Sequence, residues 1–292
     1  MNRSATGVVA FVALSALMAC KMLDRSSSGT STTSTPTTTP ELPASNEVAF
    51  KRLVPKVGTK GTMNRKTTMK FTFQNKVFRQ TTVMDTSWEV KASDEFRITK
   101  ASLNVKELYT TNQEGSGTEK RSVSPLAGST YLVTREGEGK LAAEDSGGSK
   151  VSSSVLKLIK DEFAGIFEKS HDADFLPDTR PVKLEEKLTP ASDTMLKVLG
   201  IKDDGNTLID GTEFFLKSHE SSVATFDSTM TMTQKIPGGL RVRAKLKGKF
   251  EMRPEGAWIV GVDLKGPLEI LDSKGDAKGT GDLSLEGKQT FD

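Results

Sequence analysis

The stretch "LRVRAKLKGKF" (Leu240–Phe250) alternates apolar and cationic residues over most of its length. Successive side chains of a β-strand point to opposite faces, so this spacing predicts a strand with one face in the core and one in solvent. Leu240, Val242, Ala244, Leu246 and Phe250 would form the core face. The opposite face would carry five cations, which are Arg241, Arg243, Lys245, Lys247 and Lys249.

The same alternation continues on both sides of this strand. Apolar residues occupy every second position in most of 224–232 and again in 258–264, and Leu283 and Leu285 repeat the spacing near the end. The turn sequences PGG and PEG separate the runs. We therefore predict four adjacent antiparallel strands that share one apolar face.

Three long runs near the start of the domain have the composition of a β-meander. They span Thr62–Phe73, Val77–Val90 and Glu95–Tyr109, and they are rich in threonine and aromatic residues. In the third run the apolar phase changes between Ile98 and Ala101, which predicts a β-bulge. Shorter strands are expected at Lys120–Val123, Thr130–Arg135 and Lys140–Glu144.

Two helices are expected between these groups of strands. Apolar residues recur at helical spacing from Val151 to Phe167, with charged residues on the other side, and a shorter helix is expected at Ala191–Leu199, ending at Gly200. We predict a mainly β fold with helices (α+β), in which a long curved antiparallel sheet or half-barrel of meanders covers one or two amphipathic helices.

The only cysteine of the chain, Cys20, follows an apolar run near the amino terminus. The stretch "LSALMAC" (Leu14–Cys20) ends an apolar run that begins at Gly7, and Arg3 is the only charged residue before it. As a helix this run would be about 20 Å long, too short for a hydrocarbon core of about 30 Å. Residues 1–19 therefore have the features of a secretory signal peptide.

Leu17-Met18-Ala19-Cys20 resembles the lipobox of bacterial lipoproteins. The resemblance implies cleavage before Cys20, lipid attachment to its thiol, and the membrane as a partner through that lipid. An ordinary signal peptide followed by a chance or buried cysteine is the alternative. Lys21 follows the cysteine, whereas aspartate is the usual inner-membrane retention signal in enteric relatives of the pathway. We expect a protein of the cell envelope at the outer membrane, on its periplasmic or its surface face.

A tether and one folded domain are expected after the cysteine. Residues 20–47 include "SSSGTSTTSTPTTTP" (Ser26–Pro40), which has no residues able to build a core and is open to glycosylation. Residues 48–292 form the β-rich domain. The likeness of "TTMKFTFQ" (Thr67–Gln74) to "STMTMTQK" (Ser228–Lys235) leaves open two pseudo-repeated halves joined near 145–210.

Composition and motifs favour a binding or structural protein over an enzyme. The formal net charge is only +3, which argues against a nucleic-acid partner. We expect no metal site and no cofactor, because His171 and His219 lack further ligands at metal-binding spacing. Ser154 and Lys157 match a Ser-x-x-Lys motif, but its partner motifs are missing. The cations of Arg241–Lys249 could contact an anionic surface or form a solvated outer face.

The predicted architecture resembles the lipoprotein-carrier fold of LolA and LolB, in which a curved sheet wraps helices around an apolar cavity. It is also similar to uncharacterised envelope lipoproteins with long meanders. These resemblances imply a membrane-anchored protein that binds a lipid or another apolar ligand between sheet and helix. The alternative is a structural or scaffolding lipoprotein with a filled core. Neither resemblance specifies ligand residues or an oligomeric state.

The lipid anchor can be tested by the substitution Cys20→Ser. We expect the variant to remain unlipidated and to appear as an unprocessed or soluble form. Each acyl CH₂ group buried in the membrane contributes about 0.8 kcal/mol, so loss of the chains removes the anchor. Membrane fractionation with a carbonate wash measures this. A Cys20→Ser protein that stays with the washed membranes would contradict the lipobox interpretation.

Overall fold

The computed structural model describes residues 46–137, 140–167, 173–178, 180–199, 201 and 205–291. The predicted signal peptide, Cys20 and residues 20–45 of the tether lie outside these residues, as does His171. Within the described residues, every helix is too short or too polar to span a bilayer.

A first meander forms one half of the main sheet. Its bulge lies where the sequence predicts it, because the β4–β5 register shifts opposite residues 98–101. Most strands extend beyond the predicted ranges, whereas β5 begins at Ile98 rather than at the predicted Glu95 and Lys120–Val123 matches its prediction. The strands are β3 (Lys60–Phe73), β4 (Lys76–Ser93), β5 (Ile98–Glu114), β6 (Lys120–Val123), β7 (Ser129–Gly137) and β8 (Lys140–Asp145).

A second meander contains the alternating stretch Leu240–Phe250. The predicted strands are present, and an additional one precedes them. This strand was not predicted from alternation of apolar and polar residues, because its register shifts between Asp210 and Glu213 and between Leu216 and Ser218. The order along the chain is β11 (Thr207–Glu220), β12 (Val223–Ile236), β13 (Leu240–Arg253), β15 (Trp258–Leu271) and β16 (Ala277–Phe291).

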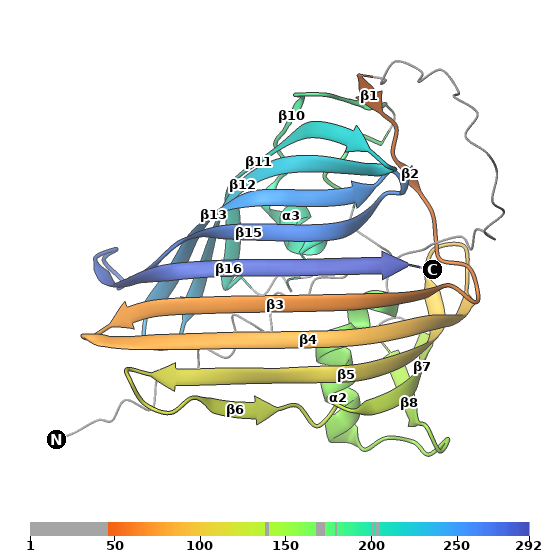
Figure 1. The fold of residues 1–292 in the computed structure, drawn as a ribbon, viewed down its shortest axis with the longest axis horizontal. Helices are drawn as coiled ribbons and strands as arrows, with labels where there is room; N and C mark the ends of the chain where they lie inside the picture. The colour runs from red at the N-terminus through yellow and green to blue at the C-terminus, as the bar shows by residue number, and fades with distance from the viewer. Residues whose placement is uncertain are drawn as a thin grey trace, which may run out of the picture.

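The two meanders join edge to edge through β16 and β3. Their antiparallel register runs from Gly279 opposite Phe73 to Phe291 opposite Gly61. The result is one continuous sheet with the order β10-β11-β12-β13-β15-β16-β3-β4-β5-β7-β8, in which β6 pairs with β5. Figure 1 shows β16 and β3 side by side in the middle of this sheet.

The chain enters the fold along one end of the sheet. Here β1 (Glu47–Val48) pairs with β9 (Val182–Lys183), and β2 (Lys51–Arg52) pairs with β14 (Glu255–Gly256). The Arg52 guanidinium donates to Asp174 Oδ1 at 2.6 Å and to Asp178 Oδ1 at 3.0 Å. The short edge strand β10 (Lys187–Leu188) pairs with β11. These contacts hold the end of the tether against the domain.

Two short helices pack on one face of the sheet, which we call the inner face (Figure 1). They are α2 (Ser153–Phe163), continued by the 3₁₀ turn η2 (Ala164–Phe167), and α3 (Ser192–Val198). Ser152 caps α2 by accepting from the Val155 amide at 3.4 Å. The prediction of a mainly β fold with helices is confirmed, although the helices cover only part of the sheet.

The inner face carries one continuous hydrophobic core, in which side chains of β3 and β16 connect two well-packed regions. On the second meander, Phe175 stacks on Phe214 with centroids 4.4 Å apart, and Phe250 meets Phe214 edge-on at 5.1 Å. On the first meander, Ile159 and Phe163 of α2 belong to the buried core together with side chains of β5 and β7. The β16–β3 pair lies between these two regions.

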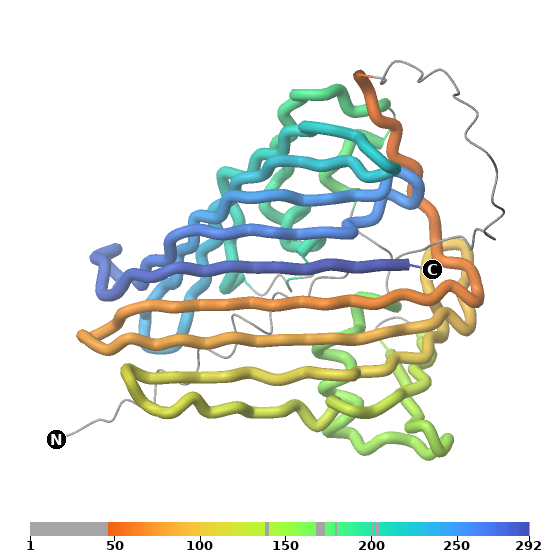
Figure 2. Tube along the Cα trace, viewed as in Figure 1, coloured from red at the N-terminus to blue at the C-terminus, as the bar shows by residue number. Residues whose placement is uncertain are grey.

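Close backbone contacts shape the second meander, whose strands bend along their length (Figure 2). A Cβ atom at Gly266 would lie 1.7 Å from the Lys245 carbonyl oxygen, and one at Gly248 would lie 1.8 Å from that of Asp263. Only glycine allows neighbouring strands to approach this closely, so these two positions determine how β13 and β15 pack.

Two glycine substitutions test this packing as a matched pair. Gly266→Ala should lower the free energy of unfolding by about 1–3 kcal/mol, because the added methyl group overlaps backbone. Gly287→Ala should leave it unchanged or raise it by up to ~1 kcal/mol. At Gly287 the nearest backbone atom, the Asn64 carbonyl oxygen, is 4.0 Å from the Cβ position. Urea unfolding measures both, and equal effects of the two substitutions would contradict the proposed close approach.

Candidate functional site

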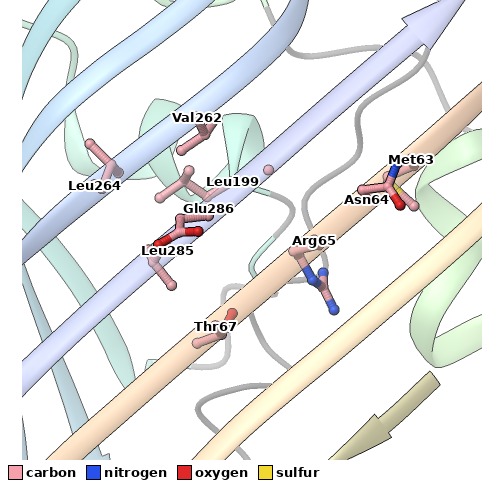
Figure 3. A pocket seen from close by; sticks show the side chains of 10 residues that line it. Met63, Asn64, Arg65, Thr67, Leu199, Val262, Leu264, Leu285 and Glu286 are labelled. Atoms are coloured by element: carbon pink, nitrogen blue, oxygen red, sulfur yellow. The ribbon is translucent and has the colours of Figure 1, made fainter. Parts of the chain in front are cut away.

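A pocket opens on the inner face where the two meanders meet. Its space between atoms is about 520 Å³, including the mouth that is open to solvent. Figure 3 shows side chains around it from β3, β15 and β16, together with Leu199 just after α3. The residues that line it are Met63, Asn64, Arg65, Thr67, Leu199, Val262, Leu264, Leu285, Glu286 and Gly287.

Strand alternation explains why most of this wall is apolar. Leu264 and Leu285 lie opposite each other on β15 and β16, and Leu285 lies opposite Thr67 on β3. All three side chains are buried. Leu199 lines the pocket from the helical side. An apolar concave wall with few polar groups is typical of small-molecule sites.

Arg65 is the cation of this wall. It shares the inner face of β3 with Met63 and Thr67, and it lies opposite Gly287 on one side and Met84 on the other. Only 10% of its side chain is exposed. Its Nη2 atom lies 3.7 Å from Oε2 of Glu162 on α2, close enough for an ion pair but long for a hydrogen bond.

Glu162 occupies a poor environment for a carboxylate. Burial raises its pKa above the ordinary value of 4.5, and the charge of Asp161 acts in the same direction, while Arg65 opposes both. The buried Oε2 atom has no hydrogen-bond partner among the described residues. Desolvation therefore outweighs the attraction of the neighbouring guanidinium at this distance.

Two more buried polar groups lie next to Met63. Gln289 on β16 and Thr86 on β4 face it from either side in the strand register. Gln289 is 4% exposed and Thr86 is fully buried. Within the described part of the chain, the amide nitrogen and oxygen of Gln289 have no hydrogen-bond partner. The Thr86 hydroxyl also has none there. Buried polar groups are normally paired, so this cluster calls for an explanation.

These groups provide the means for binding. The Arg65 guanidinium supplies hydrogen-bond donors and a positive charge in the pocket wall, and the Gln289 amide lies two residues along β16 from the lining residue Gly287, outside the lining itself. In the described ranges, no group of three or more histidine, cysteine, aspartate or glutamate side chains is arranged to hold a metal ion.

The cations predicted to contact an anionic surface lie on the outer face of β13. Arg243 donates to Glu269 Oε2 through Nε at 2.9 Å and Nη2 at 2.6 Å. Lys249 lies between Asp227 and Asp263 in the register. Acidic groups therefore lie beside Arg243 and Lys249, and contact of the five cations with an anionic surface stays a prediction. Arg241 and Arg243 are half-buried, and Lys245, Lys247 and Lys249 are exposed.

The Ser-x-x-Lys match falls on the exposed start of α2. Lys157 Nζ lies 2.7 Å from Asp161 Oδ2, an ion pair one helical turn apart. Ser154 shares a hydrogen bond of 3.0 Å with the capping residue Ser152. Both side chains thus have roles at the helix surface. His219 is exposed on β11.

The sequence analysis missed Arg65, Glu162 and Gln289. A signal for Arg65 was present, since it occupies the same strand phase as Met63, Thr67 and Met69. Glu162 likewise lies three residues after Ile159, on the apolar side of its helix. Gln289 lies where the alternation of the last strand is weak. Arg65 and Glu162 thus share one feature: each is a charged residue at a position where the pattern of its strand or helix predicts an apolar side chain.

Neither a protein-family model nor a curated protein matches the chain. Among solved structures, the chain is similar to the structure of DynF from the dynemicin biosynthesis pathway of Micromonospora chersina. The match has 11% sequence identity and a TM-score of 0.22, and it covers 87% of this chain and 92% of that chain. At this TM-score the likeness carries no argument about fold or function.

The environment of Glu162 predicts a pH dependence of stability. Because its pKa is raised, the folded protein binds a proton here at pH values where the unfolded chain has lost it, so stability falls as pH rises from about 4.5 through the raised pKa. Glu162→Gln should therefore stabilise the protein at about pH 8 and have little effect at about pH 4, where glutamate is itself protonated.

Urea unfolding at both pH values measures the difference between variant and parent. The exposed residue Glu119 provides the control, since Glu119→Gln changes the same residue type in solvent and should have little effect on stability. A Glu162→Gln protein that is less stable than the parent at the higher pH would contradict the proposed cost of burying this carboxylate.

Proposed function

We propose that this protein is a lipid-anchored lipoprotein of the bacterial cell envelope that binds an apolar or lipid-like ligand on the inner face of its sheet. The sequence Leu17–Cys20 supports the anchor, and Lys21 supports the outer membrane as its location. The Ser/Thr-rich sequence of Ser26–Pro40 suits a tether between this anchor and the domain.

The observation that carries the binding role is the apolar pocket at the junction of the two meanders. Met63, Leu199, Leu264 and Leu285 line it, between one region packed by aromatic rings and another packed by α2. An acyl chain suits such a wall, because burial of apolar surface stabilises it by about 25 cal/mol per Å².

The competing function is that of a scaffold whose inner face carries no ligand. The packed regions on both sides of the pocket favour this alternative, since much of the inner face is already filled by the protein's own side chains. The two functions differ in whether the pocket is occupied in cells.

A substitution that fills the pocket distinguishes them. Gly287 lies in the pocket wall, with open space where a side chain would begin. We expect native mass spectrometry of the lipoprotein purified from cells to detect a bound lipid on the parent and on Gly287→Ala. Gly287→Leu should lose most of that bound mass, because its side chain occupies the same space. A parent protein without bound lipid would favour the scaffold.

A further inference from the structure

We propose that the pocket is selective for a single-chain carboxylate, a fatty acid whose head group is bound by Arg65 and Gln289 beside Gly287. This inference rests on the proposed binding function and names the class of its ligand. It comes from the placement of the polar groups around one end of the apolar wall.

The first step is the gap that Gly287 leaves in the inner face. Arg65 lies directly opposite it on β3, and Gln289 is the next residue of β16 on the same face. Diagonal neighbours of this kind are about 7–8 Å apart at Cα, so both side chains can reach one small group between them. The glycine leaves room for that group at the apolar wall.

The second step is the chemistry that these side chains offer. The planar guanidinium of Arg65 can donate two parallel hydrogen bonds to a carboxylate. Gln289 adds an amide donor, and its buried NH₂ and C=O groups have no partner in the described residues. Glu162 beside Arg65 and Glu286 in the pocket lining leave no surplus of positive charge, so a head group with more than one negative charge is disfavoured.

The third step concerns Glu162, which holds the position of a counter-ion without making a good bond to Arg65. Its Oε2 atom stays 3.7 Å from Nη2 and lacks a hydrogen bond among the described residues. A ligand carboxylate placed between Arg65 and Gln289 would take over this role. The negative charge of Glu162 therefore weakens binding of an anionic ligand, and the positive charge of Arg65 strengthens it.

The test compares dodecanoate with dodecanol, which share the chain and differ in head-group charge. The mature lipoprotein is reconstituted in nanodiscs of zwitterionic lipid, and binding of each radiolabelled compound is measured against empty nanodiscs. The parent should bind dodecanoate about tenfold or more tightly than dodecanol, as expected for charge-assisted hydrogen bonds. Arg65→Met should remove this preference, whereas Glu162→Gln should strengthen dodecanoate binding several-fold.

Lys66→Met is the matched control, because it removes a neighbouring cation that is exposed on the outer face of β3, and it should leave both affinities unchanged. If Arg65→Met alone fails to fold, the double variant Arg65→Met with Glu162→Gln removes both buried charges together. It should bind dodecanol like the parent and show no preference for dodecanoate.

The outcomes separate this inference from the function on which it rests. Equal binding of both compounds by the parent, abolished by Gly287→Leu, would keep the apolar site and overturn carboxylate selectivity. Tighter binding of dodecyl phosphate than of dodecanoate would overturn the choice of head group. Binding of neither compound would overturn the proposed function, and the inference with it.

Discussion

The pairing of β16 with β3 is the constraint on which the rest of this structure depends. It joins residues more than two hundred positions apart, such as Phe291 and Gly61, and makes one sheet of two meanders. Each meander has local hairpin connections and its own packed region, around α2 in one case and Phe214 in the other. Without this non-local pairing, the inner face would be divided at the position where the pocket lies.

The pocket follows from how the two packed regions meet. The helices are short, and each one covers the meander beside it, so the wall from Leu264 through Leu285 to Thr67 lies between them. Glycines have opposite effects on the neighbouring strands β15 and β16. Gly266 allows neighbouring backbones to come very close, whereas Gly287 has open space above it. Close packing and an open site are thus produced by the same residue type a short distance apart.

Period-two alternation predicted much of the sheet, because a strand with one buried face repeats its side-chain pattern. Residues 240–250 illustrate this, and the phase change near Ile98 predicted a bulge as well. The method failed for β11, where two register shifts interrupt the pattern, and it found only Leu283 and Leu285 in β16. Alternation could not predict the site, because the order of strands in the sheet brings Arg65, Gly287 and Glu162 together. No local pattern specifies that the last strand of one meander pairs with the first strand of the other.

The polar residues at this junction are difficult to explain by stability alone. A buried ion pair seldom offsets the desolvation of both charges, and well-packed apolar side chains of similar size often stabilise a protein more. Here the pair is long, the pKa of Glu162 is raised rather than lowered, and Gln289 is buried without a partner among the described residues. Departures from good local packing tend to occur at functional sites. Arg65, Glu162 and Gln289 bring such departures together near one glycine at the edge of an apolar pocket, and this arrangement supports the proposed binding role.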